Sequence, residues 1–334
     1  MVMQNLMSGI ILKSNMPNNV LILGNGFDLD IGYKTRYSDF VNSSYWPFKE
    51  KDLSAIGVPN LQNYIYDFTE NHKDELGKVR WIDIEQLLKD YALKKNEADS
   101  YNSDIIEADK QCFKRIETAF AKYLKEQLYQ GRPSLYFKAS YELVKAISKS
   151  SNKWIGYTFN YTDSRAIINF IAQDNNTSFS TIQFIHLHGQ IDMYGYDDTL
   201  ILGIDDSVNI PKEYKFLRKT WNPNYNSHKL DDDLFRAENI ICFGWSFGEI
   251  DREYLKDFFQ ELNNVPEARA KRRGIHFITF DDKSRMDIMD NLEAIGAQMS
   301  RLKKYTDIDF YLTSQLGTPR EREKFKALCN MLSK

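Results

Sequence analysis

The sequence has few of the features that indicate a structural zinc site, a membrane protein or a nucleic-acid-binding protein. Only three cysteines occur in 334 residues, and Cys112, Cys242 and Cys329 are too far apart to form a C-x-x-C motif. A zinc site of the structural kind is therefore not expected, and nothing requires an oxidising compartment. The formal net charge of −3 offers no general attraction to nucleic acid or to an anionic membrane.

Long hydrophobic runs, internal repeats and low-complexity tracts are absent as well. The first 18 residues hold a short apolar patch, but they lack both the basic start of a signal peptide and the apolar length of a membrane span. We expect a flexible tail over residues 1–18 and a cytoplasmic protein. The hydrophobic content of 42% is ordinary for a globular chain. A length of 334 residues fits one large domain or one core domain carrying an insertion, so residues 19–334 are expected to form a single domain.

Short apolar runs alternate with amphipathic segments after residue 150, and this alternation predicts parallel strands joined by helices. After a first strand at Val20–Leu23, strands are expected over residues 154–162, 181–189, 199–205, 239–246, 274–280 and 307–313. Residues 50–150 instead carry apolar side chains at helical spacing. The prediction is an α/β fold with a Rossmann-like, doubly wound, mostly parallel sheet and a large helical insertion at about 50–150, after the first strand.

Polar and glycine residues follow five of the expected strands. In a doubly wound sheet, ligands bind beyond the carboxyl ends of the strands, so these residues are expected to meet in one site. The five strand ends are Gly24-Asn25-Gly26, Thr158–Thr162, His186–Gly189, Gly203–Asp205 and Gly244–Gly248, the last with Asp251 shortly after it.

The glycines of the first strand end can serve a phosphate or simply a tight turn. Glycine allows a ligand to approach the backbone, and the first amides of a helix attract anions, which favours a phosphate cradle at Gly24 and Gly26. The spacing is not G-x-G-x-x-G, however, and Asp28 adds a carboxylate there. Asn160 could equally be a functional residue or a turn residue.

The histidines His186 and His188 are two residues apart, so on a strand they would face the same side. A histidine beside a glycine at a strand end favours a catalytic role for His188. An H-x-H pair can also bind metal, although further ligands would have to come from Asp205, Asp206 or the run Asp231–Asp233. Glu85 is expected to face solvent or to form an ion pair.

Several of these segments are similar to motifs of a known family. The stretch LILGNGFDLDIGYKTRYSDF resembles the N-terminal signature of the AbiH family of bacteriophage abortive-infection proteins. The segments WIDIE, TFNYTD, HLHG and GWSFGEID follow in the order that this family shows, over roughly residues 19–260. The resemblance implies an antiviral defence effector, and with it a phage-derived trigger or a partner from a neighbouring gene.

The same strand ends resemble the NAD-binding fold of sirtuins. The segment 24–28 matches their Gly-Ala-Gly-Ile-Ser, 158–161 their Thr-Gln-Asn-Ile, 187–189 their Leu-His-Gly and 244–246 their Gly-Thr-Ser. This resemblance implies Asn160 and His188 as the catalytic pair. The zinc-binding cysteines of sirtuins are missing, which argues against deacylation.

The two resemblances together imply a zinc-free, sirtuin-like NAD glycohydrolase that cleaves the nicotinamide–ribose bond and works as a homo-oligomer. NAD is then a substrate, and no metal is expected. Glu85 and His186 are further candidates for the site. The residues expected to bind the dinucleotide are Gly24, Asn25, Gly26, Phe27, Asp28, Gly244, Ser246 and Asp251.

Three alternatives stay open on the sequence. The pocket could bind NAD or ADP-ribose as a sensor without chemistry. The H-x-H pair could serve a metal-dependent hydrolase or nuclease. GWSFG resembles the G-x-S-x-G nucleophile elbow, but only His276 follows it, inside an apolar strand.

Overall fold

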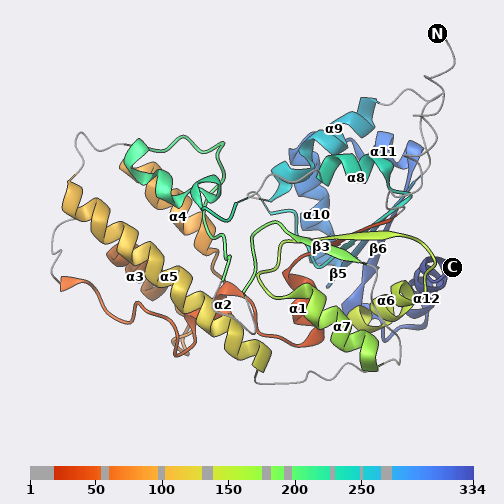
Figure 1. Cartoon of the computed structure of the whole chain (residues 1–334), viewed down its shortest axis with the longest axis horizontal. Helices are drawn as coiled ribbons and strands as arrows, with labels where there is room; N and C mark the ends of the chain where they lie inside the picture. Colours follow the sequence, from red (N-terminus) through yellow and green to blue (C-terminus); the bar gives the residue numbers. More distant parts are fainter. Residues whose placement is uncertain are drawn as a thin grey trace, which may run out of the picture.

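The computed structural model describes residues 19–53, 60–96, 102–129, 138–174, 182–191, 198–225, 230–248, 251–264 and 273–334. The tail expected over residues 1–18 lies outside this part of the chain. A parallel sheet with helices packed on it forms one part of the molecule, and a group of helices extends away from it (Figure 1). None of the helices in these ranges has the length and apolar character needed to cross a bilayer.

The sheet has six strands in the order β3-β2-β1-β4-β5-β6, and each strand is parallel to its neighbours. Connections run outward in both directions from β1, which is the arrangement of a doubly wound sheet. The predicted α/β fold with a mostly parallel sheet is therefore confirmed. The strands are β1 (Asn19–Leu23), β2 (Trp154–Thr158), β3 (Gln183–His186), β4 (Asn239–Phe243), β5 (Arg273–Thr279) and β6 (Thr306–Leu312).

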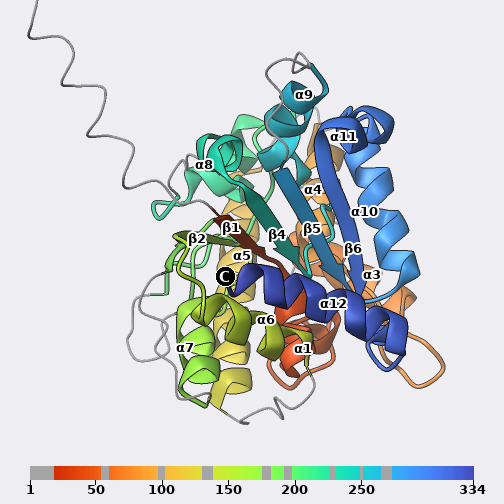
Figure 2. The same ribbon diagram turned by 90° about the vertical axis from the view of Figure 1, so that its right-hand side faces the viewer.

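Helices cover both faces of this sheet (Figure 2). Leu21 and Leu23 of β1 belong to one buried cluster, and Val20 and Ile22 belong to the other, because successive side chains of a strand point to opposite faces. This explains why β1 reads as an unbroken apolar run. The first face carries α1 (Asn25–Ile31), α6 (Ala139–Ser148), α7 (Ser164–Asp174) and α12 (Pro319–Leu332); the second carries α8 (Leu230–Arg236), α9 (Lys256–Asn264), α10 (Asp282–Ala294) and α11 (Met299–Tyr305).

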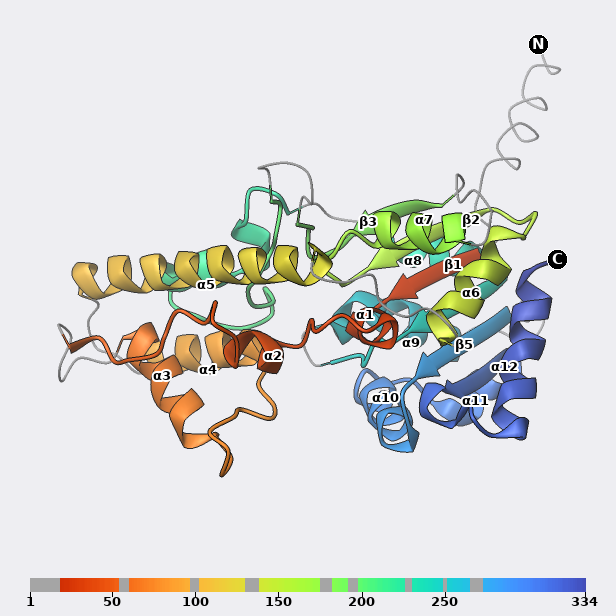
Figure 3. The same ribbon diagram turned by 90° about the horizontal axis from the view of Figure 1, so that it is seen from below.

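The segment between β1 and β2 is helical throughout its described elements, as the sequence predicted. Of its helices, α1 and α6 pack beside the sheet, and α6 contacts α7 and α12. The others extend away from it, as Figure 3 shows for α3, α4 and α5. They are α2 (Tyr37–Val41), α3 (Leu61–Asn71), α4 (Ile84–Lys95) and α5 (Ser103–Tyr129). We call α3, α4 and α5, together with residues 198–225 that pack against them, the helical lobe.

A buried carboxylate holds the helical lobe together. Asp109 of α5 is fully buried, and it accepts hydrogen bonds from the backbone N–H of Leu61 (2.7 Å) and from the hydroxyls of Tyr91 (2.5 Å) and Tyr214 (2.9 Å). These donors come from α3, α4 and the 3-10 helix Lys212–Leu217. One side chain therefore links four elements of the lobe.

The strand predicted over residues 199–205 is wrong. Leu200, Leu202 and Ile204 are buried as expected of a strand, but they pack into the apolar cluster shared with the helical lobe. None of its described residues pairs with a strand of the sheet. Ile204 forms an isolated bridge with Arg218, and the N–H groups of Thr199 and Ile201 donate to carbonyls of the loop after β3. Gly203 has a φ of +148°, which breaks the extended run. An apolar run marks burial, and here the buried surface belongs to the lobe rather than to the sheet.

The loop after β1 and the loop after β4 touch through their backbones. The N–H of Gly26 donates to the carbonyl of Gly244 (2.8 Å), and a Cβ on Gly26 would lie 2.5 Å from the Cα of Gly244. Gly244 itself has a φ of +65°. Glycine is needed here because no side chain fits between the two backbones.

We predict that Gly244→Ala destabilises the protein far more than Gly77→Ala. Both glycines have a positive φ, near +65° and +69°, so alanine costs each about 1–2 kcal/mol of backbone strain. At position 244 the new Cβ would also lie 2.4 Å from backbone atoms of Gly26, whereas at 77 it meets nothing within 4 Å. The steric overlap adds about 1–3 kcal/mol. Denaturant midpoints of the two variants test this, and equal midpoints would contradict the contact.

Candidate functional site

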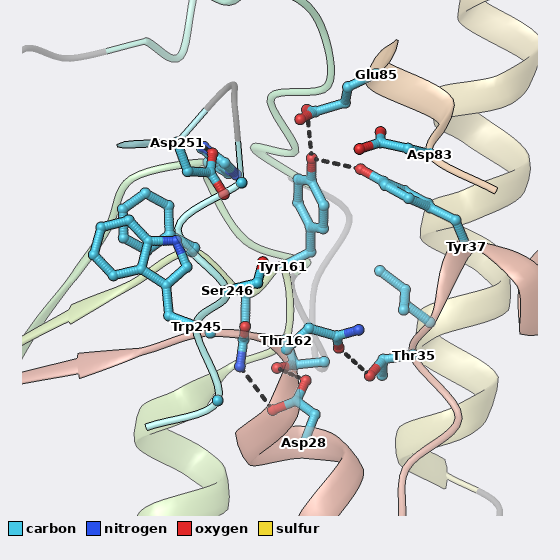
Figure 4. A pocket seen from close by; sticks show the side chains of 18 of the residues that line it. Asp28, Thr35, Tyr37, Asp83, Glu85, Tyr161, Thr162, Trp245, Ser246 and Asp251 are labelled. Atoms are coloured by element: carbon cyan, nitrogen blue, oxygen red, sulfur yellow. Dashed lines mark hydrogen bonds and ion pairs between the residues drawn. The ribbon is translucent and has the colours of Figure 1, made fainter. Parts of the chain in front are cut away.

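A cavity of about 240 Å³ lies between the carboxyl ends of the strands and the helical lobe (Figure 4). Gly24, Asn160 and Gly244 follow β1, β2 and β4 and line one side of it. Asp83 and Glu85, at the start of α4, line the side formed by the lobe. The cavity thus lies just beyond the carboxyl ends of the parallel strands, which is the place expected for a ligand.

Most of the residues that the sequence singled out meet in this cavity. The predicted site residues that line it are Gly24, Asn25, Asp28, Glu85, Asn160, His188, Gly244, Ser246 and Asp251. Gly26 lines an adjoining groove instead. Of the expected strand end Gly203–Asp205, no residue lines the cavity, although the N–H of Gly203 lies 3.4 Å from Glu85 Oε1.

Phe27 and His186 have structural positions outside the cavity. Phe27 is completely buried and packs edge-on against Phe243, with 5.4 Å between the ring centroids. Strand β3 ends at His186, so the argument that alternate residues share a face does not extend to His188. Burial lowers the pKa of His186, although the charge of Asp163 opposes this shift. Only His188 of the pair lines the cavity.

Asp28 is buried at the start of α1 and connects it to the end of β2. Its Oδ1 accepts a hydrogen bond from Asn160 Nδ2 (3.0 Å), and its Oδ2 accepts one from Thr162 Oγ1 (2.7 Å). Burial raises the pKa of Asp28 to about 7, and the two hydrogen bonds limit the rise. Asp28 can therefore change charge near neutral pH.

The hydrogen bond to Asp28 fixes which way the amide of Asn160 points. Nδ2 is held by the carboxylate, so Oδ1 is left as an acceptor. This oxygen is buried and has no partner among the described residues. An unpaired buried acceptor is costly, about 1–3 kcal/mol, and a ligand that donates a hydrogen bond would remove this cost.

Four ionisable side chains gather at the other end of the cavity. Lys219 Nζ lies 3.1 Å from Glu85 Oε2, 3.0 Å from His188 Nε2 and 3.8 Å from Asp251 Oδ1. His188 Nε2 also lies 3.3 Å from Asp251 Oδ1. Burial alone would raise the pKa of Asp251, but His188 in its protonated form and Lys219 outweigh it and hold the value below its usual range. Of the two positions expected for Glu85, the ion pair is confirmed, and the side chain is buried rather than facing solvent.

Two tyrosines, Tyr37 of α2 and Tyr161 after β2, and a further carboxylate line the cavity beside Glu85. Tyr161 donates to Glu85 Oε1 (3.2 Å), and its hydroxyl lies 3.4 Å from that of Tyr37 (Figure 4). Burial, together with the charge of Glu85, raises the pKa of Asp83 to about 6, although the N–H of Gln86 opposes the shift. The aromatic rings thus bring the carboxylates into a low-dielectric setting.

The cavity is negative above neutral pH. Asp28, Asp83, Glu85 and Asp251 line it, and Lys219 beside them is the one ammonium that pairs with this group in the described part of the chain. Four carboxylates against one ammonium attract a cationic group and disfavour a phosphate at the same place. The cavity suits a ligand that is positive or becomes positive during reaction.

A groove of about 660 Å³ adjoins the cavity. Asn25, Tyr37, Asp83, Gly244, Trp245 and Ser246 line both spaces. Three cationic side chains line the groove alone, namely Arg36, Arg80 and Lys138, and so do two exposed aromatic rings, Trp81 and Phe280. The groove therefore offers cations for anionic groups, beside the carboxylates of Asp30, Asp83 and Asp287, and exposed rings for stacking.

The start of α1 offers few free amides to a phosphate. The N–H of Gly26 donates to Gly244 O (2.8 Å), and the N–H of Phe27 donates to Gly24 O (2.9 Å). Gly24 and Gly26 bring the start of α1 into contact with the loop after β4. The helix has only seven residues, and its first turn carries the carboxylate of Asp28, which would repel a phosphate. The geometry does not favour the phosphate cradle expected at Gly24 and Gly26.

The sequence missed Lys219, Asp83 and Tyr37. Lys219 lies in the 3-10 helix Lys219–Trp221, 31 residues after His188, in a stretch with no recognisable motif. Asp83 belongs to the segment WIDIE, but its burial depends on packing between the lobe and the strand ends. The one unusual property of Lys219 is its burial, and the burial of this lysine cannot be predicted from the sequence.

We predict that Asp28 makes the folded protein less stable as pH rises from about 4 to 7. The folded-state pKa of about 7 lies above the unfolded value near 3.8, so its stabilising proton is lost over this window. The cost approaches about 1.4 kcal/mol per pH unit. Urea unfolding at pH 5 and pH 7 should show a smaller loss for Asp28→Asn than for the wild type. Equal losses would show that Asp28 is ionised throughout.

Comparison with known proteins identifies a family for this chain. A family model described as bacteriophage abortive infection AbiH matches residues 20–270, which include β1, β2, β3, β4 and every residue of the cavity. No curated protein matches the chain. The match extends over most of the sequence, and the chain therefore belongs to the bacteriophage abortive infection AbiH family.

Proposed function

We propose that the protein is an abortive-infection effector that cleaves the nicotinamide–ribose bond of NAD. Membership of the AbiH family supports the role in abortive infection of bacteriophage. The observation that carries the proposed chemistry is the meeting of Asn160, His188 and four carboxylates in one cavity at the carboxyl ends of parallel strands.

The charge of the cavity supports a reaction at the nicotinamide end. The nicotinamide ring of NAD is cationic, and the positive charge moves to the ribose as the glycosidic bond breaks. Asp28, Asp83, Glu85 and Asp251 would stabilise that charge in a partly buried setting. A volume of about 240 Å³ is too small for a whole dinucleotide, which favours entry of the nicotinamide riboside part alone.

The rest of the dinucleotide would lie in the adjoining groove. The groove shares Asn25, Gly244 and Ser246 with the cavity, so a ligand can extend from one to the other. Its cationic side chains suit the pyrophosphate, and its exposed rings suit the adenine. This assignment replaces the helix start of α1 as the phosphate site.

The reaction needs few protein groups beyond those present. A water molecule attacks C1′ of the ribose, the bonding pair of the C–N bond goes to the ring nitrogen, and neutral nicotinamide leaves. The water loses one proton, and His188 is the residue we assign to accept it. The unpaired Oδ1 of Asn160 would accept a hydrogen bond from the water or from a ribose hydroxyl.

We predict that purified protein releases nicotinamide from NAD and that His188→Ala lowers the rate by at least about 10²-fold, the usual value of a general base. His186→Gln is the matched control, because His186 lies two residues away but does not line the cavity. Nicotinamide and ADP-ribose are followed by chromatography. Unchanged release from folded His188→Ala would exclude the assigned role.

Two further measurements on the same purified protein separate the enzyme from the alternatives. A sensor would be stabilised against heat by ADP-ribose and would release no nicotinamide. A metal-dependent hydrolase would lose activity with a chelator and regain it with a divalent ion. Among the described residues no group of three His, Cys, Asp or Glu side chains is arranged to hold a metal ion, and His186 and His188 do not share the cavity.

We predict that the rate rises with pH between about 5 and 8, because ionised Asp28 and Asp83 stabilise the cation and their pKa values are near 7 and 6. Asp83→Asn should lower the rate at pH 8 by about tenfold, which corresponds to about 1.4 kcal/mol. Asp67→Asn, at an exposed carboxylate of α3, is the control. Rates that stay level from pH 5 to 8 would contradict an electrostatic role for these carboxylates.

A further inference from the structure

Lys219 is a buried lysine whose ammonium reaches from the helical lobe to the candidate catalytic histidine. Its exposed fraction is 4%, and its backbone N–H donates to the carbonyl of Ile204 (3.0 Å), which fixes the start of its 3-10 helix. Lysine is rarely buried without partners, because desolvation of an ammonium is costly. The polar partners of Nζ therefore explain how the ammonium of Lys219 can be buried.

Two of those partners lie within hydrogen-bond distance. Nζ donates to Glu85 Oε2 at 3.1 Å and lies 3.0 Å from His188 Nε2, and Asp251 Oδ1 is farther away at 3.8 Å. An ammonium has three hydrogens and no lone pair, so it can only donate. At 3.0 Å, His188 Nε2 must accept that hydrogen, and Nε2 is then unprotonated.

This contact decides what His188 can do. With Nε2 occupied, the imidazole is neutral and cannot take a proton from water at this nitrogen. Asp251 Oδ1, 3.3 Å from Nε2, is placed to stabilise an Nε2–H only if Lys219 moves away. The other groups around the ring are aromatic: Phe159, Tyr161 and Tyr254. Lys219 and Asp251 therefore compete for the same histidine nitrogen.

We propose that Lys219 is a positioning residue that, in most molecules, holds His188 neutral and unable to accept a proton at Nε2, so that the protein works at a small fraction of its full rate until Lys219 is withdrawn. This inference rests on the proposed function. Glu85 lies on α4 and Lys219 in the segment packed on the lobe, whereas His188 and Asp251 follow strands of the sheet. A shift of the lobe relative to the sheet that breaks the hydrogen bonds from the N–H groups of Thr199 and Ile201 to the loop of His188 would remove Lys219 together with Glu85 and leave His188 paired with Asp251.

The test compares wild type with Lys219→Met, which keeps the length of the side chain but removes its charge. Lys212→Met is the control, at an exposed lysine of the same segment. Because Lys219→Met leaves Glu85 buried and unpaired, the double variant Glu85→Gln/Lys219→Met removes both charges of the pair and guards against misfolding. Proteins labelled with ¹⁵N-histidine are titrated by NMR, with His188→Gln to assign the signal.

We expect His188 to take up a proton at a pH at least one unit higher in Lys219→Met and in the double variant than in the wild type. Lys212→Met should titrate as the wild type does. Nicotinamide release from NAD by Lys219→Met should rise at least tenfold and should vanish in His188→Ala/Lys219→Met. The NMR readout does not depend on any reaction.

The outcomes separate this inference from the proposed function. An unchanged titration of His188 in both Lys219 variants overturns the hold of Lys219 on His188, whatever the reaction. A fall in nicotinamide release to the level of His188→Ala also overturns it, because Lys219 would then assist the chemistry. A shifted titration with no nicotinamide from any variant supports the hold on the proton and overturns the NAD glycohydrolase instead.

Discussion

Charge buried beside the strand ends is the constraint on which the rest of the site depends. Carboxylates that leave water need a partner, a proton or a hydrogen-bond donor, and each of the three solutions is present here. Glu85 is paired with Lys219, and Asp251 is kept ionised by Lys219 and by His188 when that ring is protonated. Asp28 accepts two hydrogen bonds and has a pKa near neutrality. The helical lobe and the contact between Gly26 and Gly244 keep these groups close together around the cavity.

The helical lobe contributes to the site as well as covering it. Without α4 and the segment around Lys219, the strand ends would provide Asp28, Asn160, His188 and Asp251 but no Glu85 and no ammonium. The hydrogen bonds that Asp109 accepts, from one backbone N–H and two tyrosine hydroxyls of three other elements, link the lobe into a unit. A site divided between a sheet and a separately braced lobe is suited to control by movement of one against the other.

The sequence predicted the fold class and the place of the site for one physical reason. Parallel strands end at the same edge, so Gly24, Asn160, His188 and Gly244 could be brought together without knowing any contact between them. It could not predict contacts made across long separations. Lys219 has no local signal, the role of Gly26 depends on the carbonyl of Gly244, and the apolar residues 200–204 are buried by the lobe rather than by a neighbouring strand.

The most direct measurement of the central claim is a crystal structure of His188→Ala grown with NAD, in which binding is separated from turnover. The account predicts the nicotinamide ring and its ribose in the cavity, with Asn160 Oδ1 in hydrogen-bond contact, and the adenosine end in the adjoining groove between Trp81 and Phe280. A dinucleotide bound with its pyrophosphate in the acidic cavity, or bound at another surface, would contradict it.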